Sequence, residues 1–188
     1  FIEVFKQLTI GIAIGFISMM VINTFVLAGQ IIAMQTGLGF ASIVDPINGI
    51  SVPAVGQFYL ILATLLFWTF DGHLFMIEMI VVSFEAFPIN DAWFTPEQFR
   101  EIAHWAGWMF VSAVTIALAP IVSLLIVNLA FGVMTKASPQ LNIFSIGFAI
   151  AQLTGLFIIW LTLANQAHHF EQQWTRAQTL MCNLVNAC

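Results

Sequence analysis

Long uncharged runs dominate the hydrophobic and polar pattern of this chain. With histidine counted as neutral, the runs are Gln7–Val44, Ile102–Thr135, Ala137–Phe170 and Val52–Phe84, the last interrupted only by Asp71 and Glu78. Crossing the hydrocarbon layer takes about 20 residues. Each run is therefore long enough for one tilted helix or for a hairpin of two shorter helices. The pattern predicts an all-α membrane protein built from long, kinked helical hairpins.

Helix signals divide the runs into four segments within a single helical membrane domain, residues 1–188. The predicted segments are roughly Thr9–Gln35, Ala54–Phe84, Pro96–Met134 and Pro139–Phe170. Gly72 weakens the second segment, and Pro120 predicts a kink in the third. The chain starts at Phe1 with apolar sequence, so we expect it to be a fragment that lacks a preceding hydrophobic region.

An irregular stretch at residues 36–53 separates the first two segments. Its first part contains two glycines, which permit positive φ, and an Asp-Pro pair, which ends a helix. The residues that we single out are Gly37, Leu38, Gly39, Phe40, Ala41, Ser42, Ile43, Val44, Asp45 and Pro46. Irregular backbone at membrane depth persists only where protein or a water-filled cavity covers it. This stretch therefore points to a gate, a pore or a transport site.

Polar side chains recur inside the apolar segments. They are Asn23, Gln30, Asp71, His73, Glu78 and Asn128. Polar groups within membrane helices usually face protein rather than lipid, so we expect contacts with other helices or subunits. Asp71, Glu78 and Glu85 follow one another at seven-residue spacing and form an acidic stripe on one helix face. The stripe is either a polar face packed on a partner or a lining that attracts cations.

Small residues occur at helical spacing in two segments. Gly11 and Gly15 form a GxxxG pair, and Gly147, Ala151 and Gly155 recur every four residues. Such faces allow two helix backbones to approach closely. We expect both faces to pack against helices.

Composition and charge narrow the function. The chain is 61% hydrophobic and 7% charged, with a formal net charge of −5, so it lacks the basic surface that nucleic-acid binding needs. Acidic residues concentrate in a polar loop at residues 86–101, where Thr95-Pro96-Glu97 predicts a helix start. No nucleotide-binding, metal-binding or nucleophile motif occurs. We expect no cofactor, no metal and no enzymatic activity.

Several ordered motifs resemble one family. They are Ala28-Gly29-Gln30, Gln35-Thr36-Gly37-Leu38-Gly39-Phe40-Ala41, Asp45-Pro46, Asp71-Gly72-His73-Leu74 and Lys136-Ala137-Ser138-Pro139-Gln140-Leu141-Asn142-Ile143-Phe144. In this order and spacing they resemble the FliR family of the type III export gate, which flagella and virulence injectisomes share. Lys136, Pro139, Gln140 and Asn142 mark the hairpin motif. One departure is Ala149, where the family pattern has proline.

The resemblance implies a subunit of an inner-membrane channel core with FliP and FliQ homologues, in the flagellar basal body. FlhB and FlhA homologues would be further partners, membrane lipid would surround the complex, and unfolded flagellar proteins would be exported through it. In such a family the stretch Gly37–Pro53 corresponds to a plug in the closed pore. Pro139–Phe148 favours the flagellar branch over the injectisome branch.

Two other functions stay open on the residues alone. A small-solute secondary transporter is suggested by the broken helices and by Asp71 and Glu78. An intramembrane enzyme that uses Asp71 and His73 is disfavoured, because the two side chains point to different sides of a regular helix.

Overall fold

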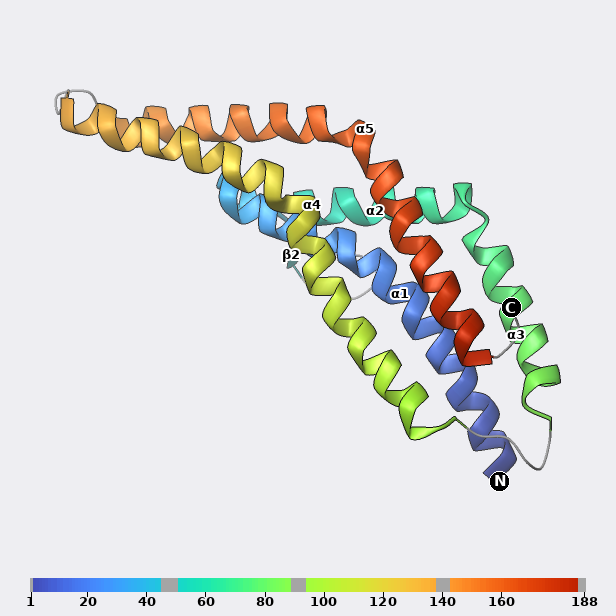
Figure 1. Ribbon diagram of the computed structural model, residues 1–188. Helices are drawn as coiled ribbons and strands as arrows, with labels where there is room; N and C mark the ends of the chain where they lie inside the picture. The colour runs from blue at the N-terminus through green and yellow to red at the C-terminus, as the bar shows by residue number, and fades with distance from the viewer. Residues whose placement is uncertain (1, 45–50, 89–93, 138–142, 186–188) are drawn as a thin grey trace.

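The computed structural model describes residues 2–44, 51–88, 94–137 and 143–185. The elements are α1 (Ile2–Thr36), a 3₁₀ turn η1 (Leu38–Phe40), β1 (Ser42–Val44), β2 (Ser51–Pro53), α2 (Ala54–Thr69), α3 (Gly72–Ala86), α4 (Pro96–Ala137) and α5 (Ile143–Val185). The predicted all-α class of long helices is confirmed (Figure 1). The short antiparallel pair β1–β2 was not predicted.

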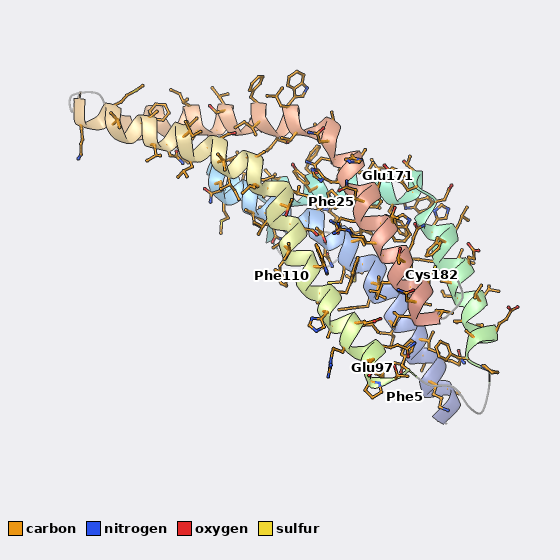
Figure 2. The ribbon with its side chains drawn as sticks, viewed as in Figure 1. Phe5, Phe25, Glu97, Phe110, Glu171 and Cys182 are labelled. Carbon is orange, nitrogen blue, oxygen red and sulfur yellow. The ribbon has the colours of Figure 1, made fainter. Side chains whose placement is uncertain are left out.

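Helix α1 is the centre of the fold. It contacts α2, α3, α4 and α5, and Figure 1 shows it between α4 and the C-terminal part of α5. Its buried side chains recur at three- and four-residue spacing and include Ile14, Ile17, Val21, Phe25 and Ile32. In Figure 2 the labelled Phe25 lies inside the bundle, where its ring is 5.6 Å from that of Phe170.

Two long helices form an arm that projects from the bundle. The arm consists of the C-terminal part of α4 and the N-terminal part of α5, which run side by side (Figure 1). Helix α4 changes direction near its middle, where Pro120 lies inside the helix. Proline removes one backbone hydrogen bond and its ring displaces the preceding turn. The kink predicted for this helix therefore has its expected cause.

The opposite end of the bundle, which we call the base, joins the start of α1, the end of α3, the start of α4 and the end of α5. Gln7 Nε2 donates to the Phe87 carbonyl at 3.3 Å, and Gln98 Nε2 donates to the Leu184 carbonyl at 2.9 Å. Thr95 and Gln98 also form a capping box: the Thr95 amide donates to Gln98 Oε1 at 2.7 Å, and the Gln98 amide donates to Thr95 Oγ1 at 3.3 Å. Helix α4 thus begins where the Thr95-Pro96 signal predicts, inside the polar stretch 86–101.

The last helix is longer than predicted. The predicted end near Phe170 is wrong, because α5 continues to Val185. His168 and Glu171, on either side of Phe170, are exposed on the outer face of this helix. Phe170, Trp174, Ala177 and Met181 continue a buried stripe on the inner face, so this part of α5 is an amphipathic helix packed on the bundle.

By length and composition, three of the helices described are able to cross a membrane. They lie within Val4–Thr36, Pro96–Met134 and Gly147–Val185. Helices α2 and α3 together form a further candidate, bent by 63° at their junction. The break predicted at Gly72 is therefore present, and the second predicted segment consists of two helices.

Candidate functional site

The irregular stretch predicted after the first segment starts at Gly37. This glycine adopts a left-handed conformation, with φ 73°, and its amide donates to the Met34 carbonyl at 3.4 Å. A left-handed residue directly after a helix is a common termination, and glycine adopts it without a Cβ penalty. Helix α1 thus ends at Thr36 because Gly37 turns the chain into η1.

A short ladder joins the two sides of the stretch, which we call the α1–α2 loop (residues 37–53). Ile43 pairs with Val52, and Val44 pairs with Ser51. The Ala54 amide donates to the Ala41 carbonyl at 2.8 Å, which fixes the start of α2 against the end of η1. The expected residues Asp45 and Pro46 lie outside the described part of the chain. The described backbone of the loop is therefore ordered by its own hydrogen bonds.

The loop root, Thr36 and Gly37, packs directly on helix α5. A Cβ added at Gly155 would meet Thr36 Cγ2 and, at 2.9 Å, Thr36 Cβ. A Cβ added at Gly37 would lie 2.7 Å from the Phe148 ring. Both glycines are thus required by close approach.

Two hollows flank this contact. One, of about 360 Å³, is lined by the end of α1, including Gln35 and Thr36, and by Asn128, Phe131, Gly147, Phe148 and Ala151 of the arm. The other, of about 340 Å³, is almost wholly apolar and lies between η1, α2 and α5, with Leu38, Phe58, Leu156 and Ile159 in its wall. The predicted polar residue Asn128 is therefore brought beside the loop root by the arm.

A second irregular site is the corner between α2 and α3. Within the described residues, Asp71 is the non-glycine residue with positive φ, at 53°. A Cβ at Gly72 would collide with the ring of Phe67. That ring packs edge-on against Trp174 at 5.1 Å, and the His73 ring stacks on Trp68 at 4.9 Å. The α2–α3 corner therefore packs against α5 through the aromatic contact between Phe67 and Trp174.

The acidic stripe begins at this corner and continues along the exposed side of α3. Asp71, Glu78 and Glu85 are all exposed on or beside α3, among exposed apolar residues such as Leu74 and Val81. Asp71 and His73 share the corner, but His73 stacks on Trp68. Among the described residues no group of three His, Cys, Asp or Glu side chains is arranged to hold a metal ion.

The remaining predicted residues are dispersed. Gln30 is half-buried and packs on α2, because a Cβ at Gly56 would lie 3.1 Å from its Cγ, and Asn23 is half-buried on α1. A Cβ at Gly147 would make only ordinary contact with Phe131, at 3.7 Å. Lys136 is exposed in the last turn of α4. The other hairpin-motif residues, Pro139, Gln140 and Asn142, lie outside the described residues.

The predicted GxxxG pair, Gly11 and Gly15, makes no close helix contact in the described residues, whereas a second pair, Gly29 and Gly56, does. A Cβ added at Gly11 or Gly15 would meet nothing within 4 Å, so no helix packs against them within the described part of the chain. Helices α1 and α2 instead cross at Gly29 and Gly56. A Cβ at Gly29 would lie 3.0 Å from the Val55 carbonyl oxygen and 3.1 Å from Gly56 Cα. Sequence reasoning missed this crossing, because one glycine from each helix leaves no repeat within either helix.

Comparison with known proteins identifies a family. The chain matches the family described as bacterial export proteins, family 1, over residues 1–177. It is 37% identical over 158 residues to the flagellar biosynthetic protein FliR of Pectobacterium carotovorum subsp. carotovorum, covering 84% of this chain and 60% of that protein. It is 32% identical over 181 residues to FliR of Escherichia coli (strain K12), covering 96% of this chain and 69% of that protein.

A relative with a different name is the surface presentation of antigens protein SpaR of Shigella flexneri. It is 28% identical over 159 residues, covering 84% of this chain and 60% of that protein. The chain thus spans about 60% to 69% of the length of these curated relatives. With a family match over residues 1–177 and 32% identity to a FliR of which it covers 69%, this chain belongs to bacterial export proteins family 1, the family of flagellar FliR.

Proposed function

We propose that this chain is a non-enzymatic subunit of a bacterial flagellar protein-export channel, and that its α1–α2 loop is the gate. The family match carries the proposal. The FliR proteins of Pectobacterium carotovorum and Escherichia coli, at 37% and 32% identity, are more similar to this chain than SpaR at 28%, which favours a flagellar over an injectisome assembly, although a Buchnera FliR, at 27%, is not more similar than SpaR. FliP and FliQ homologues would complete the channel in the inner membrane, with FlhA and FlhB homologues beside it and unfolded flagellar proteins as its substrates.

The form of the loop supports a gating role. Its flanks are short strands joined by backbone hydrogen bonds, and its root packs on α5. Its first part, Leu38-Gly39-Phe40-Ala41-Ser42-Ile43-Val44, is uncharged and, apart from Ser42, apolar. An apolar constriction excludes ions because water is unfavourable there. A loop of this kind is suited to seal a channel whose other walls come from neighbouring subunits.

A loop deletion in the assembled complex tests the gate. The complete protein is co-expressed with its FliP- and FliQ-like subunits, with and without Gly39–Ile43. Removing these residues should let ions or small solutes leak through a complex that still co-purifies in its normal composition. The Gly107→Ala variant is the control, because a Cβ there meets nothing within 4 Å. An assembled deletion complex that stays as tight as this control would refute the gating role.

A further inference from the structure

We infer that helix α5 fixes the position of the α1–α2 loop through Gly155 and Phe148, which act as positioning residues for the gate. The contact itself follows from the geometry. Its effect on the seal of the channel rests on the proposed function. It concerns the root of the loop, which the structure describes, and helix α5 of the arm.

The first step is the rigidity of Thr36. Its side chain is 1% exposed. Its hydroxyl donates to the Ala33 carbonyl at 3.1 Å and accepts the Leu38 amide at 3.3 Å. These two bonds fix the rotamer and leave the methyl group directed at Gly155. The methyl group therefore cannot turn away from α5 without breaking the bonds that connect α1 to η1.

The second step is the unequal stiffness of the two contacts. Phe148 covers Gly37 from the arm, but its side chain is 49% exposed, so its ring has room to move. Gly155 is buried, and its close neighbours include the Cβ of a bonded threonine. Packed interiors do not absorb added atoms without a shift of the backbone or of side chains. Gly155 is therefore the stiffer of the two positioning contacts, and the Phe148 ring against Gly37 is the softer one.

The third step concerns what surrounds the contact. The hollows of about 360 and 340 Å³ lie on its two sides along α5, so Gly155 and Phe148 carry the contact between the loop root and this helix. Because α5 continues into the arm (Figure 1), any displacement of the arm changes the surface on which Thr36 and Gly37 rest. Helix α5 is thus the element through which a neighbour bound to the arm would shift the gate.

The test compares two glycines on the same helix. Gly155→Ala forces an atom against Thr36, whereas Gly147→Ala makes only an ordinary contact at 3.7 Å. In the assembled complex, hydrogen exchange is measured at the Ala41 and Ala54 amides, which close the loop. We expect exchange about tenfold faster or more in Gly155→Ala, together with a solute leak. Gly147→Ala should change neither measurement.

Two further variants keep the inference testable if Gly155→Ala fails to assemble. Thr36→Ser removes the methyl group and keeps the hydroxyl, so combining it with Gly155→Ala should restore part of the slow exchange. Phe148→Leu should accelerate exchange at the same amides, whereas Phe157→Leu, on an exposed part of α5, should not. Only a contact that positions the loop predicts both the partial rescue by Thr36→Ser and the difference between Phe148→Leu and Phe157→Leu.

The outcomes separate the two proposals. Equal exchange at Ala41 and Ala54 in the Gly155→Ala and Gly147→Ala complexes, or in the Phe148→Leu and Phe157→Leu complexes, overturns the positioning role. A leak on loop deletion would still support the gate in that case. Conversely, faster exchange in Gly155→Ala supports the positioning contact even if loop deletion causes no leak, a result that would refute the gate alone.

Discussion

At the scale of single residues, the α2–α3 corner depends on the absence of one Cβ. Gly72→Ala would place that atom against the ring of Phe67, which is 9% exposed and packed on Trp174. Overpacking of this kind costs about 1–3 kcal/mol. Thermal unfolding in detergent should therefore show a destabilised Gly72→Ala chain. Gly107→Ala, with open space around its Cβ, is the control and should be neutral or slightly stabilising.

Asp71 tests the same corner through its backbone. Its left-handed conformation, with φ 53°, is tolerated by Asn and Asp but is strained for a β-branched residue. Asp71→Asn should keep the stability of the chain, whereas Asp71→Val should lower it by about 1–2 kcal/mol. Both are compared by thermal unfolding. A loss of stability in Asp71→Asn as large as in Asp71→Val would mean that the carboxylate charge, rather than the backbone, determines the role of this residue.

At the scale of elements, local chemistry predicted most helix boundaries. Gly37 ends α1, Pro53 precedes α2, and Thr95 caps α4, because each acts on neighbouring backbone groups. Two features escaped prediction. The β1–β2 ladder lies within apolar sequence that also suits a membrane run. The C-terminal part of α5 was missed because the predicted segment ended at the polar residues beside Phe170, although Trp174 and Met181 continue an apolar stripe at helical spacing.

The residues of the candidate site could be predicted from the sequence, but their proximity in the fold could not. The sequence marked Gly37, Gly155 and Asn128 by residue type, but it could not show that α5 and the arm bring them together at the loop root. That proximity joins residues more than 90 positions apart in the chain. It follows from tertiary packing, which residue periodicity does not encode.

The crossing of α1 and α2 gives a prediction for helix packing. In Gly29→Ala the new Cβ would press on backbone atoms of Val55 and Gly56, which cannot rotate away. We expect a loss of about 1–3 kcal/mol in the free energy of unfolding. Gly15→Ala, on the same helix but with nothing within 4 Å, is the matched control. Equal unfolding temperatures for the two variants would mean that the helices separate easily at this crossing.

At the scale of the whole molecule, exposed charged residues lie at the base, and the arm is mainly apolar. Glu97, Arg100 and Glu101 are exposed at the base, where Figure 2 shows the labelled Glu97 and Phe5 at the same end. The described part of the arm carries large exposed apolar side chains, among them Leu125, Leu129, Leu153 and Trp160, and its charged residue is Lys136 near the tip. Exposed apolar surface on this scale is expected where lipid or another subunit covers it.

The outer face of α1, which carries Gly11 and Gly15, is a candidate contact surface for a neighbouring subunit. Gly11 and Gly15 have open space around them, and Ile12, Phe16 and Met19 beside them are exposed. A GxxxG face that none of the helices described here covers fits a helix of a neighbouring subunit. Gly15→Leu should therefore leave thermal unfolding of the isolated chain unchanged but reduce co-purification of partner subunits severalfold. Gly107→Leu on α4 is the control, because a Cβ there also meets nothing within 4 Å and the residue lies outside any GxxxG pair. Because both substitutions add the same side chain to an open helix surface, equal co-purification would argue that lipid, rather than a subunit, covers this face of α1.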